Sequence, residues 1–204
     1  MKKILLLAAL ALALPMAVFA DSIDYSNSGG TLAASNAVGP AVLMLSGSEL
    51  ISIRGFPGSQ ITGNNLGSVS FTTGLLTSGS LANGGTFAGG GTFMITGNGS
   101  NGAPTGVIFT GTFTGPVSWT LNTQSDGTHT YTLMGTLSGT YASGFKTTGT
   151  TMQLTVNTGL GFFNGSVTDS SGDTNILVPE PGSLGLLGTG LIGLAGIVRR
   201  KLKA

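Results

Sequence analysis

The chain has 204 residues, no cysteine, one histidine and a formal net charge of +1. Six of its eight Lys and Arg residues lie at the two ends, so residues 21–177 hold two basic and six acidic residues, a net charge of −4. Two basic residues are too few for the basic cluster of a nucleic-acid-binding protein. The absence of cysteine excludes a disulfide framework and thiol catalysis, and with only one histidine it also excludes a typical zinc site.

Residues 1–20 predict a secretory signal peptide. Lys2 and Lys3 precede an apolar core of 11 residues that ends before Pro15, and a small residue, Ala20, stands before the expected cleavage point at Asp21. Eleven apolar residues are too few for a stable membrane span. We therefore expect the secretion machinery to export the chain and the signal to be removed, with an uncleaved anchor as the alternative.

Residues 21–177 predict one Gly/Thr-rich, all-β domain. Apolar residues alternate with polar ones, as in Val117, Trp119 and Leu121, which is typical of strands with one face on a core and the other in water. Asn-Gly and Asp-Gly pairs between these runs indicate turns. The pattern predicts about ten to twelve short strands in a single antiparallel β-sandwich or barrel-like fold.

Two other interpretations of this region stay open. A β-solenoid needs a fixed repeat, but the Gly-Thr-Phe triplets begin at Gly85, Gly91 and Gly111, which are unevenly spaced. Gly/Ser/Thr-rich composition also permits disorder, and residues 79–105 are the segment where a loose structure is expected. The 10 phenylalanines argue against disorder of the whole domain.

The single histidine gives little support for catalysis. His129 follows Ser125 and Asp126, but a Ser–His–Asp triad is assembled by the fold, so closeness in sequence is no evidence for one. Because strand side chains alternate between two faces, His129 lies on the same face as Tyr131 and Leu133. This predicts a histidine that is buried or lies at the edge of the sheet.

Acidic residues offer two weak candidates for a site. Asp169, Asp173 and Asn175 fall in an oxygen-rich stretch that predicts a solvated turn, or a calcium loop whose spacing is not that of an EF-hand. Glu49 together with one Asp could provide the paired carboxylates of a glycoside hydrolase. We expect neither, and no cofactor or metal.

Threonine recurs at alternate positions in two runs, one from Thr110 to Thr114 and one from Thr128 to Thr132. Rows of threonine methyl and hydroxyl groups can bind ice or carbohydrate surfaces. Threonine is also a common residue on the wet face of a strand because of its high β-propensity. A surface-binding module therefore remains an alternative interpretation.

Residues 178–204 predict a membrane-associated tail. The 17 residues from Gly182 to Val198 carry no charge and would form a helix of about 25 Å, at the short end of what can span a bilayer. Six glycines weaken this span. Arg199, Arg200 and Lys201 should hold the end in the cytoplasm, which places the domain on the other side.

The residues before the span predict an exposed, extended strap. Pro179 and Pro181 fix their own φ angles and bias the preceding residues, Val178 and Glu180, toward extended conformations. Such a strap beside a membrane is a shape that a protease can bind. A permanent anchor and a buried core helix with a basic end are the alternatives.

The order Val-Pro-Glu-Pro, short Gly/Leu-rich span and basic cluster resembles the PEP-CTERM sorting domain of exported bacterial proteins. The resemblance covers residues 178–203 and implies recognition by exosortase, a membrane-embedded sorting enzyme, at Val178, Pro179, Glu180 and Pro181, with Arg199, Arg200 and Lys201 as the topology anchor. The same tail type occurs on ice-binding proteins, so it indicates a route and not an activity.

The sequence as a whole predicts an exported, exosortase-sorted structural or interaction protein without catalytic activity. We expect it on the outer side of the inner membrane first, and then at the cell surface or in the extracellular matrix. An envelope or matrix polysaccharide is a further candidate partner. A carbohydrate- or ice-surface-binding β-module and a secreted hydrolase are the alternative functions.

Overall fold

The computed structural model describes residues 21–36, 40–55, 60–168 and 171–178. Ser22–Val178 form one compact unit. Its strands are β1 (Asp21–Ser28), β2 (Thr31–Ala34), β3 (Leu43–Arg54), β4 (Ile61–Thr72), β5 (Leu76–Ser80), β6 (Gly84–Phe87), β7 (Gly90–Asn98), β8 (Thr105–Phe113), β9 (Val117–Thr123), β10 (His129–Tyr141), β11 (Lys146–Gly159), β12 (Ser166–Thr168) and β13 (Ser171–Val178). The one helical element among the described residues is a 3-10 turn, η1 (Ser100–Gly102).

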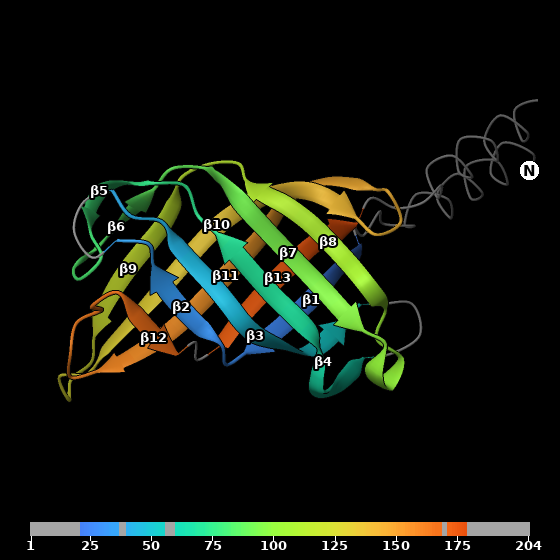
Figure 1. Ribbon diagram of the computed structural model, residues 1–204, viewed down its shortest axis with the longest axis horizontal. Coiled ribbons are helices and arrows are strands. Elements are labelled where there is room, and N and C mark those ends of the chain that lie inside the picture. The colour runs from blue at the N-terminus through green and yellow to red at the C-terminus, as the bar shows by residue number, and fades with distance from the viewer. Residues whose placement is uncertain (1–20, 37–39, 56–59, 169–170, 179–204) are drawn as a thin grey trace, which may run out of the picture. The chain divides into compact units, whose positions relative to one another are not determined.

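Eight of the strands close into a barrel (Figure 1), in the order β1, β3, β4, β7, β8, β10, β11 and β13, with β13 returning to β1. The pairing of β10 with β11 is long and antiparallel, from His129 opposite Gly159 to Thr140 opposite Lys146. The predicted all-β, barrel-like fold is therefore confirmed. The β-solenoid alternative is wrong because the strands form one closed sheet.

The remaining strands extend the sheet at one end of the barrel. β10 pairs with β8 through residues 137–141 and with β9 through residues 129–134, so that its two halves have different neighbours. From β9 the sheet continues to β6 and β5, and from β3 it continues to β2 and β12. Each branch ends at a strand edge that has no further strand beside it among the described residues.

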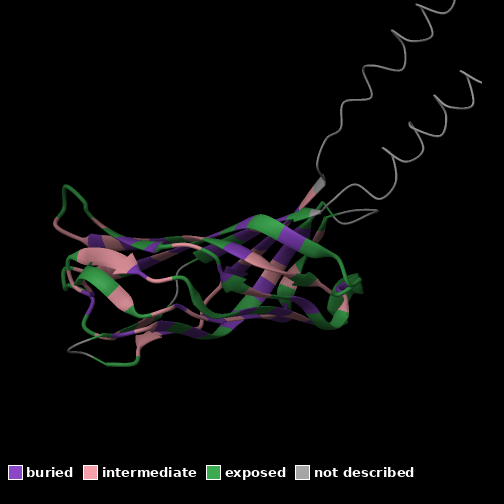
Figure 2. Cartoon of the chain, turned by 90° about the horizontal axis from the view of Figure 1, so that it is seen from above, coloured by how far each residue is buried: buried purple, intermediate pink, exposed green. Residues whose placement is uncertain are grey.

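The barrel interior is an apolar core, and buried residues alternate with more exposed ones along most of the strands (Figure 2). An eight-stranded barrel is just wide enough for its own side chains to fill. Four phenylalanines form one aromatic cluster with ring centroids 6.0–6.4 Å apart, namely Phe71, Phe93, Phe109 and Phe113. Burial of each such ring stabilises the fold by about 1.5–3 kcal/mol.

A few polar side chains lie inside the barrel and hydrogen-bond to each other. Tyr25 of β1 and Tyr141 of β10 share a hydrogen bond of 2.8 Å between their hydroxyl groups. Burial raises the pKa of Tyr25, so this hydroxyl stays protonated. On the same strand as Tyr25, the Asn27 amide donates to Ser48 Oγ at 2.7 Å. These bonds join strands that are far apart in sequence.

Three expectations need correction. Residues 79–105 are not loose, since they include β6, β7 and η1. Asp173 and Asn175 lie on β13 and not in a solvated turn or calcium loop, because β13 begins at Ser171 and pairs with β11. Val178, assigned to the extended strap, is the last residue of β13, and its backbone is extended as predicted. The structure also has thirteen strands where ten to twelve were expected.

Glycine permits a close approach of two strands at Gly139 of β10. A Cβ atom there would lie 2.1 Å from the Thr110 carbonyl oxygen of β8 and 2.6 Å from the Phe109 ring. We therefore expect Gly139→Ala to lower the free energy of unfolding by about 1–3 kcal/mol, measured by urea denaturation, because the strands must move apart.

Gly115 offers a matched control. A Cβ atom at Gly115 meets only the Thr136 hydroxyl, at 3.9 Å, and neither glycine has a positive φ angle. Gly115→Ala should change the unfolding free energy by no more than about 0.5 kcal/mol. Equal effects of the two substitutions would show that the contact between β8 and β10 is not the cause.

Candidate functional site

An open pocket of about 510 Å³ lies along β5 at the extended end of the barrel. At the start of β5, the Leu76 amide donates to the Ala41 carbonyl oxygen at 2.8 Å, which joins this end of β5 to the segment before β3. Pro40 and the loop before β12 supply the rest of the wall. The lining residues are Pro40, Leu76, Thr77, Ser78, Gly79, Ser80, Leu81, Ala82, Phe163 and Asn164.

An aromatic cluster holds the segment after β5 in place. Trp119 Nε1 donates to the Leu81 carbonyl oxygen at 2.9 Å, and the Tyr131 hydroxyl donates to the Ala82 carbonyl oxygen. The Trp119 and Tyr131 rings stack at 4.7 Å, and the Phe163 ring meets Trp119 edge-on at 5.4 Å. The pocket wall is therefore fixed to the core, although its residues come from separate parts of the chain.

The chemistry of this pocket is neutral. Its lining provides hydroxyl groups from Thr77, Ser78 and Ser80 and the amide of Asn164, and none of the described residues that line it has a titratable side chain. Such a wall can form hydrogen bonds with an uncharged polar ligand. It supplies no general acid or base from its own side chains.

His129 is a buried histidine, as its strand parity predicted. Its Nδ1 lies 3.0 Å from Thr123 Oγ1, and its ring stacks on the Phe162 ring at 4.3 Å. Asp126 accepts hydrogen bonds from the amide and the hydroxyl of Thr128, which lower the pKa of Asp126. Asp126 thus caps its own turn and does not orient the histidine.

Glu49, Asp24 and Asp173 lie on the outer surface of the barrel and do not line the pocket, whereas Asp169 lies outside the described residues. Glu49 is exposed on β3, opposite Ser28 of β1. Asp24 of β1 lies opposite Arg54, and it also interacts electrostatically with Asp173. Burial raises the pKa of Asp24, repulsion by Asp173 raises it further, and Arg54 opposes both effects. Glu49, the carboxylate considered for a hydrolase, is not part of this group.

The two threonine runs lie at different places on the barrel. Thr112 of β8 is opposite Ser138 of β10, which is six residues, or about 20 Å, beyond Thr132. Thr132 instead forms a cross-strand row with Thr120 of β9 and Thr155 of β11. The expected runs therefore do not form one array, but a shorter row that spans three strands does exist.

The predicted sorting residues Pro179, Glu180 and Pro181 and the basic residues from Arg199 to Lys201 lie outside the described residues, as does the predicted span 182–198. Within the described part of the chain, no helix has the length and apolar character needed to cross a membrane. The prediction of a sorting tail therefore depends on the sequence motif alone. The pocket, in contrast, is identified from the described structure.

Comparison with known proteins supports the interpretation of the tail. Residues 177–201 match the family model of the PEP-CTERM protein-sorting motif. The match begins within β13, one residue before its end. No curated protein and no solved structure matches the chain at a significant level. The motif implies export, processing by exosortase and a membrane-anchored sorting signal.

Proposed function

We propose that this PEP-CTERM protein, which is exported and sorted by exosortase, serves as a non-enzymatic structural or interaction protein of the cell envelope or extracellular matrix. The observation that carries the proposal is the sorting motif at residues 177–201, which begins at the end of β13, the last strand of a closed β-barrel. A sorting tail delivers its attached domain to the cell exterior, so the barrel is the part that acts there.

The properties of the barrel support a role without catalysis. Its pocket offers hydroxyl and amide groups, and the described residues that line it include no carboxylate, histidine or amine for proton transfer. Its histidine is buried against Phe162, and Asp126 is engaged by Thr128. A barrel with few charged residues and many exposed hydroxyl groups suits contact with a hydrated polymer such as an envelope or matrix polysaccharide.

A surface-binding module for carbohydrate or ice is the second candidate. The row Thr120, Thr132 and Thr155 favours it, because three threonines lie side by side across neighbouring strands. The row is short, however, and the other threonine run lies elsewhere on the barrel. The structural or interaction role therefore has the stronger support.

A deletion and complementation experiment in the native bacterium tests the proposal. Loss of the gene should weaken surface-attached aggregates, and the full chain should restore them. A chain that ends after Val178 should be exported without restoring them, because it lacks the sorting motif. A far-ultraviolet spectrum of the exported, truncated protein provides the control that its barrel has folded.

Two results would contradict the proposal. The first is recovery of the full chain from the cytoplasm of wild-type cells. The second is equal restoration by the truncated and the full chain, which would mean that sorting contributes nothing to the role. The intact mass of the mature protein, taken from the same cells, shows whether the tail has been removed.

A further inference from the structure

One end of the barrel brings the β10–β11 hairpin beside the start of the sorting motif. The Thr147 hydroxyl, at the beginning of β11, donates to the Leu177 carbonyl oxygen of β13 at 2.6 Å. β11 and β13 are antiparallel, so the chain before Thr147 runs in the same direction as the chain after Leu177. Phe145 and Lys146 therefore extend from the same end of the barrel as the chain that leaves β13.

Chain length limits how far this end can lie from a membrane. Four residues, 178–181, separate Leu177 from the uncharged run that begins at Gly182. Whatever their conformation, the five residue steps from Leu177 to Gly182 reach at most about 18 Å. The headgroup layer on each side of a bilayer is about 5–8 Å thick. A tail anchored in the membrane thus holds this end of the barrel at, or within about 13 Å of, the headgroup surface.

The hairpin tip has the chemistry of a membrane-interface contact. Phe145 is 43% exposed, and Leu177 beside the hairpin is 39% exposed. Lys146 is exposed and is one of only two basic residues in 21–177. The other, Arg54, lies opposite the carboxylate of Asp24. An aromatic ring next to a lysine can enter the headgroup region while the ammonium group meets lipid phosphates.

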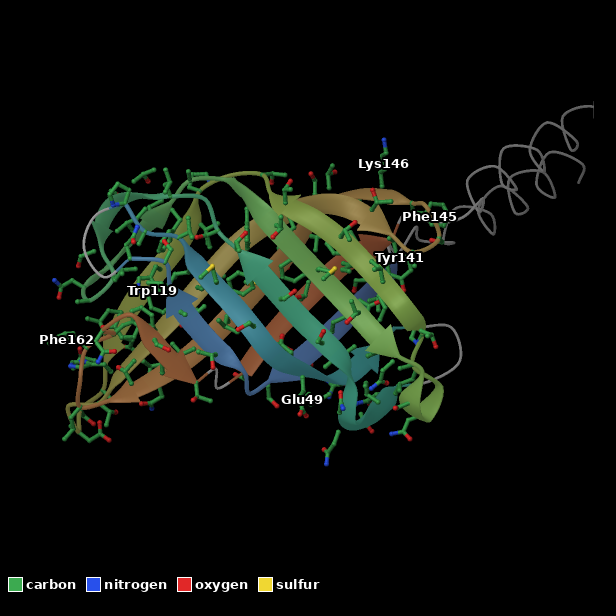
Figure 3. All side chains as sticks on the ribbon, in the orientation of Figure 1. Glu49, Trp119, Tyr141, Phe145, Lys146 and Phe162 are labelled. Carbon is green, nitrogen blue, oxygen red and sulfur yellow. The ribbon has the colours of Figure 1, made fainter. Side chains whose placement is uncertain are left out.

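We propose that the Phe145–Lys146 tip of the β10–β11 hairpin docks on the anionic surface of the membrane that holds the sorting tail, and so orients the barrel before the tail is processed. Figure 3 shows Phe145, Lys146 and Tyr141 at one end of the barrel and Phe162 and Trp119 at the other. The proposal rests on the membrane-anchored sorting signal and not on the role of the barrel after sorting.

The opposite end of the barrel provides a matched control. Phe162 is 51% exposed, slightly more than Phe145, and also lies in a loop between strands. It stacks on His129 and has no basic neighbour in the loop before β12. If exposure alone governed membrane contact, Phe145 and Phe162 would contact the membrane equally. Docking by the hairpin predicts contact for Phe145 only, because β13 ends beside Phe145 and not beside Phe162.

Quenching by brominated lipids distinguishes these outcomes. Phe145→Trp and Phe162→Trp are made in the full chain and reconstituted in vesicles of phosphatidylcholine with phosphatidylglycerol. The native Trp119 is 1% exposed, so the wild-type chain supplies its background signal. We expect at least about twofold stronger quenching of the tryptophan at position 145 than of the one at position 162.

The role of Lys146 is tested in the same vesicles. Adding Lys146→Glu to Phe145→Trp should reduce the quenching about twofold in vesicles with phosphatidylglycerol and leave it unchanged in pure phosphatidylcholine. An unchanged signal in both would overturn the electrostatic part of the proposal. Both positions lie at the exposed hairpin, and a near-ultraviolet spectrum verifies that each variant keeps the wild-type packing around Trp119.

Flotation of the vesicles separates this proposal from the sorting function. If the protein floats with the vesicles but the two tryptophans are quenched equally, the tail anchors the chain and the hairpin does not dock. If the hairpin signal changes only when exosortase is added, the contact is with protein, which also overturns the proposal. If the chain does not float at all, both the membrane anchoring and the docking are wrong.

Discussion

Replacing Trp119 with alanine is expected to lower the free energy of unfolding by about 3–5 kcal/mol. That is a large part of the 5–15 kcal/mol that stabilises a typical domain. Trp119 is 1% exposed, and its ring stacks on Tyr131 and meets Phe163 edge-on. Its removal leaves a cavity and also takes the hydrogen-bond donor from the Leu81 carbonyl oxygen.

Two further variants separate these contributions. Trp119→Phe keeps most of the apolar volume but leaves the Leu81 carbonyl oxygen without its indole donor, which costs about 1–3 kcal/mol. Leu160→Ala alters a side chain that is 75% exposed and should change stability by no more than about 0.5 kcal/mol. Urea denaturation followed by circular dichroism measures all three. A loss below 1 kcal/mol for Trp119→Ala would show that the cluster does not support the fold.

The local pattern of the sequence was sufficient to predict the strands but not their order. Alternation at Val117, Trp119 and Leu121 reports which face of one strand is buried, because the side-chain period of a strand is two residues. Barrel closure depends on which strands meet, and here β1 pairs with β13, which come from opposite ends of residues 21–178. No local period contains this information.

Two local interpretations were wrong for a related reason. The stretch that contains Asp173 and Asn175 is rich in polar turn-forming residues, yet it pairs with β11 as a strand. Small polar residues are acceptable on the outer face of a barrel whose other face is fully packed. The alternating Gly172, Thr174 and Ile176 are buried, but two of these three are not apolar, so the usual signal of a strand was weak.

The sorting motif could be recognised from the sequence, whereas the pocket could not. The sorting motif is linear, so its prolines, uncharged run and basic end could be recognised without a fold. The pocket could not, because Leu81, Phe163 and Trp119 come together only through pairing of β9 with β6 and β10. A lone tryptophan in an alternating run was the one available signal, and it indicated burial rather than a pocket.

Replacing Pro179, Glu180 and Pro181 together with alanine is expected to leave export intact and to trap an unprocessed, membrane-bound form. The two prolines keep this stretch extended, whereas alanine is the best helix former. Three alanines would allow a helix in the following apolar run to extend back toward Val178, which ends β13. The enzyme would then lose the extended segment that we predict it binds.

Processing can be followed with one label in the barrel and one at the end of the chain, and the structure shows where each can be placed without disturbing a strand. A label next to Val178 would disturb β13, so the body label is inserted in the exposed turn at Ser125 and Asp126, and the second label follows Lys203. In wild-type cells with an active exosortase, the body label should persist on molecules that have lost the second label. In the triple-alanine variant, both labels should remain on one molecule in the membrane fraction.

Glu180→Ala alone is the control that separates backbone shape from charge, because it keeps both prolines. If the extended backbone is what exosortase requires, this single variant should be processed far better than the triple variant. If it is blocked to the same extent, recognition depends on the carboxylate instead. Loss of the second label from the triple variant at the wild-type rate would contradict the assignment of Pro179, Glu180 and Pro181 as the processing site, since a tail without its extended segment would still be a substrate.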